Sequence, residues 1–285
     1  MLEIDFKLII QIYLFFVLGI ITIAFTGHEE ISREWIIIPD KVNLYEKPDF
    51  SKKTKIEIWG YPKMVVDISE LETPHDQSET QWIKIIQGQN HYFLPKALLI
   101  KNVPRSESDG NLLPGQEKVD RWNPLPFHYK PDDLIKIPQK WNYHTQGYPK
   151  YLRSETSQML LEMLTAAEGQ NIHIRVVSAF RSALDQRRLY LRKINQAGLD
   201  QVLVAKPGHS EHQLGTTVDL CGLDPDYVLK PEFETTKEGK WLQDNAARYG
   251  FKQSYTKENT TETGYSPEPW HFRYFGTGFW GSFAR

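Results

Sequence analysis

Short apolar runs separated by turn residues fill the region between Trp35 and Ile100. The runs recur about every ten residues, with Pro, Gly, Asp and Asn between them. Such spacing is typical of short antiparallel strands. The stretch QWIKIIQGQNHYFLPKALL predicts a hairpin with Gly88 in its turn and a final short strand. We therefore expect a small, β-barrel-like domain over residues 35–100.

Helical and strand patterns alternate in the remainder of the chain. A helix is predicted over residues 154–169, with Ser154 as its cap, because Leu160, Met163, Leu164 and Ala167 recur at helical spacing. Further helices are predicted over 182–196, with Ser182 as the cap, and over 241–249, ended by Gly250. Strands are predicted at 172–177, 216–221, 251–255 and 269–275. The mixture predicts an α+β domain over residues 124–285, with a mainly antiparallel sheet and flanking helices.

An uncharged segment precedes the β region. Residues 8–26, LIIQIYLFFVLGIITIAFT, form a run of 19 residues without a charge, close to the roughly 20 that cross a bilayer as a helix. Residues 1–30 are therefore predicted to be an apolar anchor helix, with a cleaved signal peptide as the alternative. Both interpretations place the rest of the chain in the cell envelope, outside the cytoplasm, either anchored or secreted.

Composition narrows the classes of function. The chain carries 34 basic and 36 acidic residues, so it lacks the strong positive charge of a nucleic-acid-binding protein. Its single cysteine, Cys221, excludes an internal disulfide and a cysteine-based zinc site. Residues 101–123 are polar and rich in Pro and Gly, and we interpret them as a linker between the two domains.

The stretch PGHSEHQLGTTVDL, residues 207–220, contains two metal-ligating residue types at the entrance to an apolar strand. Pro207 and Gly208 exclude a helix there, and Gly215 permits a sharp bend, so His212 and Asp219 can reach one ion. A catalytic zinc site takes three nitrogen or oxygen ligands and leaves one position open for water. The third ligand must therefore come from elsewhere in the chain.

The stretch SPEPWHFRYFG, residues 266–276, supplies the best donor. His271 fits the third ligand, and Glu268 fits the carboxylate that takes a proton from water without binding the ion. Each of these residues taken alone also has an ordinary structural explanation, such as a loop histidine or a turn aspartate. The prediction rests on their occurrence together.

A third stretch, SAFRSALDQ, joins the strand at 172–177 to the following helix. Arg181 stands where its fork of donors can grip a carboxylate. Three neighbouring polar residues, Ser178, Ser182 and Gln186, are candidates for the lining of the same pocket. His209 is assigned to the rim of the cleft rather than to the metal.

The joint pattern resembles the zinc D-alanyl-D-alanine carboxypeptidases of the VanY type. Residues 210–219 match S-x-H-x-x-G-x-x-x-D, residues 268–274 match E-x-W-H-x-R-Y, and SAFRSALDQ is similar to the family's S-G-Y-R-S-x-x-x-Q. The opening NPLPFHYKPDDLIKI also looks like that of the family, so the resemblance covers about residues 120–276. Two departures are Thr217, where the family mostly has alanine, and Ala179-Phe180 in place of Gly-Tyr.

The resemblance implies a role for each matched residue. His212, Asp219 and His271 are implied as the ligands of one Zn²⁺ per chain. Glu268 is implied as the catalytic base, and Arg181 as the contact to the substrate carboxylate or the transition state. Ser178, Gln186 and Ser210 are the expected substrate-binding residues. The β region, in turn, resembles a bacterial Src-homology-3-like barrel through VNLYEKP, Trp82 and HYFLPKALL.

The predicted function is removal of the C-terminal D-alanine from the stem peptide of peptidoglycan by zinc-dependent hydrolysis. One alternative is an L,D-carboxypeptidase that acts on tetrapeptide stems with the same ligands. The other is a non-catalytic envelope protein, with the β region as its binding part. The expected partners are the stem peptide, a wall or envelope ligand of the β region and, if the anchor is uncleaved, the membrane; nucleic acid is not expected.

Overall fold

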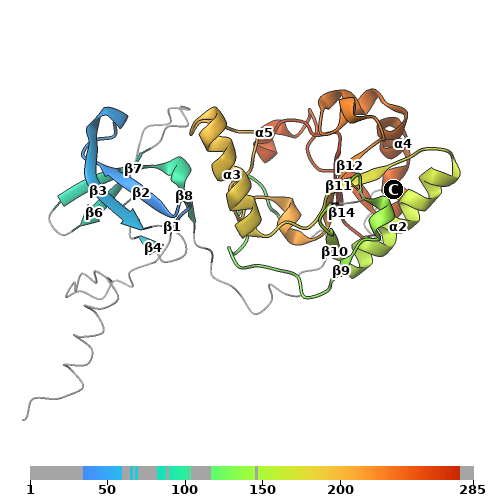
Figure 1. The fold of residues 1–285 in the computed structure, drawn as a ribbon, viewed down its shortest axis with the longest axis horizontal. Coiled ribbons are helices and arrows are strands. Elements are labelled where there is room, and N and C mark those ends of the chain that lie inside the picture. Colours follow the sequence, from blue (N-terminus) through green and yellow to red (C-terminus); the bar gives the residue numbers. More distant parts are fainter. Residues whose placement is uncertain are drawn as a thin grey trace, which may run out of the picture.

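The computed structural model describes residues 35–59, 65–66, 68–69, 82–87, 90–101, 103, 117–144 and 147–276. The predicted anchor segment and the hairpin turn at Gly88 lie outside these residues. Within the described ranges, no helix is both long enough and apolar enough to cross a membrane. Figure 1 shows a β-rich part beside a larger part in which helices surround a sheet.

The β-rich part consists of two small antiparallel sheets. The strand orders, over the residues that are described, are β4-β1-β8 and β3-β2-β7-β6-β5. The β6–β7 ladder runs from the Trp82–Pro95 pair to the Gln87–Asn90 pair, which confirms the two predicted hairpin strands. The strands are β1 (Trp35–Ile37), β2 (Lys41–Tyr45), β3 (Lys53–Trp59), β4 (Val65–Val66), β5 (Ile68–Ser69), β6 (Trp82–Gln87), β7 (Asn90–Pro95) and β8 (Leu99–Lys101), with 3₁₀ turns η1 (Phe50–Lys52) and η2 (Lys96–Leu98).

The larger part is an α+β fold built on antiparallel sheets, as predicted. Its main sheet has the order β11-β12-β14-β13, and β9 and β10 form a separate ribbon. The strands are β9 (Leu134–Lys136), β10 (Tyr151–Arg153), β11 (Arg175–Ser178), β12 (Thr217–Cys221), β13 (Phe251–Gln253) and β14 (His271–Tyr274). The helices are α2 (Ser154–Gly169), α3 (Ala183–Ala197), α4 (Lys237–Asn245) and α5 (Thr260–Thr263), with 3₁₀ turns η3 (Gln139–Trp141), η4 (Glu211–Leu214), η5 (Pro225–Tyr227), η6 (Pro231–Thr235) and η7 (Ala246–Tyr249).

The predicted helix bounds are confirmed for α2, lie one residue early for α3 and are wrong for α4. α2 has the predicted bounds, but Ser154 is already helical and Arg153 stands at the cap without a side-chain bond, so the predicted cap is wrong. The Ser182 hydroxyl does cap α3, by accepting from the amide of Asp185 at 3.1 Å. α4 begins at Lys237, earlier than predicted, because the hydroxyl of Thr236 accepts from the amide of Gly239 at 3.0 Å.

One face of the main sheet is closed by α2. The helix side chains that the periodicity singled out are fully buried, and they belong to the same cluster as sheet residues Val176, Val218, Leu220 and Phe272. Burying a large aliphatic side chain contributes about 1.5–3 kcal/mol. This packing fixes β12 and β14 in the centre of the sheet.

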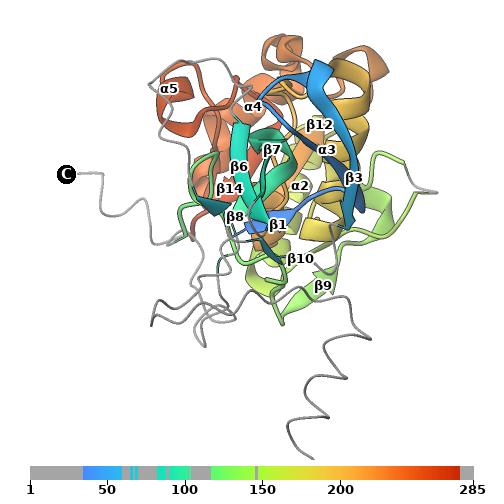
Figure 2. The same cartoon turned by 90° about the vertical axis from the view of Figure 1, so that its left-hand side faces the viewer.

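The β-rich part packs against α3 of the larger part (Figures 1 and 2). Ile38 and Ile100 form one buried cluster with Ala183 and Tyr190 of α3. The Tyr190 hydroxyl donates to the Ala97 carbonyl at 3.0 Å. Buried polar contacts therefore reinforce an apolar interface between the two parts.

Two cations add to this interface from the larger part. Arg187, which is 7% exposed, donates through Nε to the carbonyl of Ile38 and through Nη2 to Asp40 at 2.7 Å. The Lys206 ammonium donates to the carbonyls of Lys96 and Leu99 at 3.1 and 3.2 Å. Both side chains satisfy backbone oxygens that the interface removes from water.

We predict that Arg187→Met lowers the free energy of unfolding by about 1–3 kcal/mol, because it leaves the buried Ile38 carbonyl without its donor. The matched control is Arg188→Met, on the next position of α3, whose side chain is 63% exposed. That change is expected to stay within about 0.5 kcal/mol. Denaturant unfolding of both full-length variants measures the difference, and equal effects would contradict the assigned role.

Candidate metal centre

The loop that leads into β12 brings two predicted ligands to one place. His212 lies in the 3₁₀ turn η4, and Gly215 ends that turn with a φ of +72°. The left-handed conformation favours glycine, and a Cβ on Gly215 would lie 2.9 Å from a methyl carbon of Leu134, which would have to move. The predicted bend is confirmed, and β12 then carries Asp219 back beside His212.

The third predicted ligand reaches the same point through strand pairing. Asp219 of β12 and His271 of β14 are direct partners in the antiparallel register. One ligand atom from each of His212, Asp219 and His271 lies within 4.8 Å of the others, and all three residues are buried. The structure therefore gathers two nitrogens and one carboxylate oxygen from residues that are far apart in sequence.

Each histidine offers a defined nitrogen to this cluster. The Nδ1 of His212 lies 2.8 Å from the carbonyl of Ala179, which can only accept, so Nδ1 carries the proton. Its Nε2 lies 3.1 Å from Oδ2 of Asp219. His271 has the opposite orientation, with Nδ1 3.1 Å from Oδ1 of Asp219 and Nε2 2.9 Å from Oε2 of Glu211.

The cluster favours a positive charge at its centre. Burial alone lowers the pKa of His271, but its hydrogen bonds with Asp219 and Glu211 outweigh this and raise the pKa to about 10. Burial alone raises the pKa of Asp219, yet His212 and His271 hold that pKa well below its usual range. Negatively charged groups at the centre of a site favour the binding of a cation, as a metal site requires.

Glu268 lies beside the three-residue cluster rather than in it. Its Oε2 is 3.4 Å from Nδ1 of His271, and its amide donates to the carbonyl of Tyr255 at 3.0 Å. Burial, reinforced by the charge of Asp219, raises the pKa of Glu268 to about 7. A carboxyl group with this pKa can both take and give a proton near neutral pH.

Arg181 extends over the same region from the segment between β11 and α3. Its amide donates to the carbonyl of His212 at 3.1 Å, which ties the two segments together. Arg181 is half-buried, and its buried Nε has no hydrogen-bond partner within the described part of the chain. Burial lowers the pKa of Arg181, and the charges of Asp219 and Glu268 oppose that effect. A half-buried arginine with an unused donor beside two carboxyl groups is well suited to an anionic ligand.

The other predicted residues have different surroundings. Ser178 pairs with Asp219 across β11 and β12, and Ser210 is buried at the start of η4. Gln186 donates to the carbonyl of Ala205 at 2.7 Å, so its amide group holds a loop. His209 is not among the residues of the metal cluster, and its Nδ1 lies 3.0 Å from the carbonyl of Asp120.

Sequence reasoning missed Glu211. This residue fills a variable position between Ser210 and His212, and its carboxylate bridges His271 and Arg273 in the interior. Arg273 stands two residues after His271, on the same face of β14. A buried arginine at that spacing was the available signal, since such a cation requires an acidic partner.

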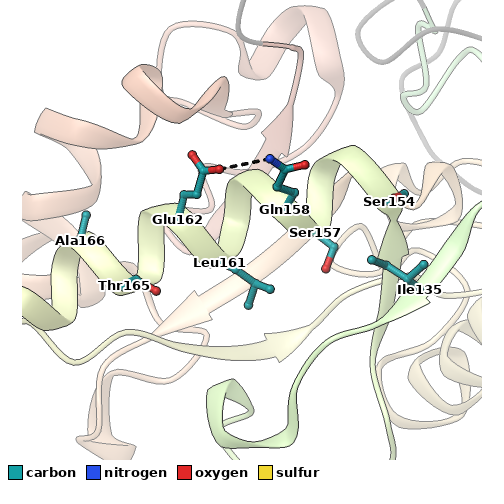
Figure 3. A pocket seen from close by; sticks show the side chains of 8 residues that line it. All are labelled: Ile135, Ser154, Ser157, Gln158, Leu161, Glu162, Thr165 and Ala166. Carbon is teal, nitrogen blue, oxygen red and sulfur yellow. Dashed lines mark hydrogen bonds between the residues drawn. The ribbon is translucent and has the colours of Figure 1, made fainter.

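A hollow on the outer face of α2 is separate from this centre. Figure 3 shows Ile135 beside Ser154 and Ser157 at one end of the helix, with Gln158 bonded to Glu162 at 3.3 Å farther along it. None of the predicted site residues lines it. The candidate metal ligands and catalytic residues therefore lie at the sheet and not in this hollow.

Two histidines and an aspartate that converge on a sheet, beside a glutamate with a raised pKa, define the arrangement of a candidate metallopeptidase. Comparison with known proteins agrees with this class. The model of the VanY family, described as D-alanyl-D-alanine carboxypeptidase, matches residues 149–277. VanXYC of Enterococcus gallinarum, named a bifunctional D-Ala-D-Ala dipeptidase and D-Ala-D-Ala carboxypeptidase, is 32% identical over 163 residues, which are 55% of this chain and 82% of that protein. The chain belongs to the VanY family.

Two further relatives define the extent of the likeness. YodJ of Bacillus subtilis is 34% identical over 160 residues, which are 55% of this chain but only 59% of that protein. The solved structure of the LdcB LD-carboxypeptidase is 34% identical, with a TM-score of 0.52, and the match covers 56% of this chain and 75% of the other. The likeness thus spans about half of the chain and only part of the length of YodJ.

We predict that Gly215→Ala lowers the free energy of unfolding by about 1–3 kcal/mol, since alanine is strained in the left-handed conformation and its Cβ displaces Leu134. Gly169→Ala is the control, because Gly169 lies in α2, has no positive φ and has nothing within 4 Å of its added Cβ. That change is expected to leave stability unchanged or to raise it by up to about 1 kcal/mol. Denaturant unfolding compares the two variants, and equal effects would show that the conformation and surroundings of Gly215 have no energetic cost for alanine.

Proposed function

We propose that this protein is a zinc-dependent carboxypeptidase that removes the C-terminal D-alanine from peptidoglycan stem peptides. The observation that carries the proposal is the convergence of His212, Asp219 and His271, with Glu268 and Arg181 beside them. Family membership and the name of VanXYC support the same chemistry.

The donor set fits one zinc ion per chain. Two imidazole nitrogens and one carboxylate oxygen leave a position for water, as in catalytic zinc sites. The charges also fit, because the four carboxyl groups of Glu117, Glu211, Asp219 and Glu268 outnumber the two guanidinium groups of Arg181 and Arg273. A divalent cation offsets that excess. When bound, zinc supplies a more acidic water and polarises a carbonyl group.

Glu268 is proposed to move the proton. It takes the proton from the attacking water and passes it to the nitrogen of the leaving D-alanine as the peptide bond breaks. A pKa of about 7 suits both steps. The net reaction consumes one water and yields a shortened peptide and free D-alanine.

Arg181 is proposed to bind the free carboxylate at the end of the substrate. Its unused donor is buried within the same region as the ligands. An arginine that reads a terminal carboxylate restricts cleavage to the last residue of the peptide. Ser178 and Ser210, which flank the ligands, are proposed to line the same pocket, and Gln186 to support it through Ala205.

The second candidate function is an L,D-carboxypeptidase that acts on tetrapeptide stems. The observation that favours it is the likeness to LdcB, at 34% identity and a TM-score of 0.52. The ligands and the base would be the same in both reactions. The difference lies in which stereochemistry the pocket accepts before the scissile bond.

We propose that residues 124–285 form the carboxypeptidase domain and that the other parts of the chain bring this domain to its substrate. Residues 35–100 are proposed to form a Src-homology-3-like module that binds a wall or envelope ligand. Residues 1–30 are proposed to export the chain, as an anchor or a signal peptide, so that it acts outside the cytoplasm. Residues 101–123 are the proposed linker, although Asp120 is buried and accepts from the backbone amides of Trp122 and Asn123.

The direct test is incubation of the zinc-loaded full chain with pentapeptide and tetrapeptide stems, with products identified by mass. Loss of one D-alanine from the pentapeptide, abolished by a chelator, is the expected result. Loss from the tetrapeptide alone would establish the L,D alternative. No cleavage of either peptide by a zinc-loaded chain would contradict both.

We predict that Glu268→Gln lowers kcat about 10²–10⁴-fold, because an amide cannot accept and return the proton. Zinc content should be retained, since Glu268 is not among the three ligands. The matched control is Glu262→Gln, whose side chain is 70% exposed, and it should keep full activity. An active Glu268→Gln enzyme would contradict the proposed role of the glutamate.

We predict that Arg181→Met raises KM for a peptide with a free C-terminus by about 10–150-fold, the value of losing a charged hydrogen bond. The control is the same peptide with its terminus converted to an amide. Wild type should discriminate against the amide, whereas the variant should treat the two peptides alike. Discrimination that survives in the variant would exclude Arg181 as the carboxylate contact.

A further inference from the structure

The carboxylate of Glu211 connects a proposed metal ligand to a buried arginine. Its Oε2 lies 2.9 Å from Nε2 of His271, and its Oε1 accepts from Nη1 of Arg273 at 3.0 Å. Glu211, His271 and Arg273 are 5%, 3% and 3% exposed. A carboxylate that is paired with the guanidinium group of Arg273 offers only acceptor atoms, so Glu211 accepts on both of its oxygens.

A second carboxylate residue holds the other side of Arg273. Nη2 donates to the backbone carbonyl of Glu117 at 2.8 Å and to its Oε2 at 3.2 Å. Glu117 precedes residues 149–277, the range that the family model matches. The chain of contacts thus runs from an upstream segment through Arg273 and Glu211 to His271.

This geometry selects the nitrogen that His271 offers. Because Glu211 can only accept, the Nε2 that faces it carries a proton, and the ring turns Nδ1 toward Asp219. Arg273 fixes Glu211 in turn. With Oε1 bonded to Arg273 and Oε2 bonded to His271, the carboxylate has little freedom to rotate. Carboxylates that orient a ligating histidine in this way raise its affinity for the metal.

We propose that Glu211 is a positioning residue that holds His271 in its metal-binding orientation, and that Arg273, held by Glu117, keeps Glu211 in place. The proposal rests on the proposed function, because it assumes that His271 binds the ion. Glu211 does not contact the substrate in this role. Its effect passes entirely through the imidazole ring.

The test compares Zn²⁺ affinity of the full chain and of Glu211→Gln, by competition with a chromogenic chelator. A glutamine at this position has one acceptor oxygen. Its amide NH₂ group must therefore face an N–H donor of either His271 or Arg273, and that hydrogen bond is lost. We expect Zn²⁺ affinity to fall about 10–100-fold. With Co²⁺ in place of zinc, the visible absorption bands should shift, which reports a changed ligand geometry independently of activity.

The matched control is Glu238→Gln, which removes another buried carboxylate, 7% exposed, on α4. Its Zn²⁺ affinity and Co²⁺ spectrum should equal those of wild type. Equal affinities and spectra for Glu211→Gln and wild type would overturn the proposal. Equal weakening in Glu238→Gln would overturn it as well, because the effect would then not be specific to His271.

A second variant decides the matter if Glu211→Gln does not fold. Arg273→Lys keeps the charge but cannot bridge Glu211 and Glu117 with a planar fork. It should weaken Zn²⁺ binding at least about threefold, and unchanged affinity would overturn the proposal. A folded wild-type chain that binds no Zn²⁺ would contradict the proposed function itself. A wild type that binds Zn²⁺ no more tightly than the variants would contradict only the proposed role of Glu211.

Discussion

The pairing of Asp219 with His271 across β12 and β14 is the constraint on which the candidate site depends. A strand slip of one residue would turn both side chains to the opposite face of the sheet. The buried cluster that α2 forms with Val218, Leu220 and Phe272 prevents that slip, because the alternate residues of the same strands fill the core. The hydrophobic packing of one face therefore fixes the polar geometry of the other.

The buried charges follow from that arrangement. Glu117, Glu211, Asp219 and two histidines are buried, with the partly exposed Glu268 beside them, and unpaired charges are unfavourable in such a region. The two arginines differ in the partners of their side chains. Arg273 donates to Glu211 and Glu117 through both of its terminal nitrogens, although its Nε, like that of Arg181, has no partner in the described part of the chain. Arg181 lies beside Asp219 and Glu268, and its proposed partner is the substrate. The remaining negative charge is what a divalent cation offsets.

The candidate ligands could be predicted from sequence because residues 210–219 and 268–274 together resemble the motifs of a known family, and because the local pattern was consistent with convergence of these residues. Gly215 indicated the bend, and an acid and a histidine in apolar strands indicated a common point. Glu211 could not be found in this way, since its partners His271 and Arg273 are more than fifty residues away and only the fold brings them together. The contact of Arg187 with Ile38, between residues 149 positions apart, is of the same kind. The strands and α2 were predictable from periodicity, whereas the caps at Arg153 and Thr236 depended on local hydrogen bonds that periodicity does not report.

The most direct test of the proposed centre is X-ray absorption spectroscopy at the zinc edge on the metal-loaded full chain. The arrangement of His212, Asp219 and His271 predicts one zinc per chain, with two imidazole ligands and oxygen ligands in the remaining positions. A single imidazole, a sulfur ligand, or no bound zinc in a folded chain would contradict the assignment of these three residues as one metal site.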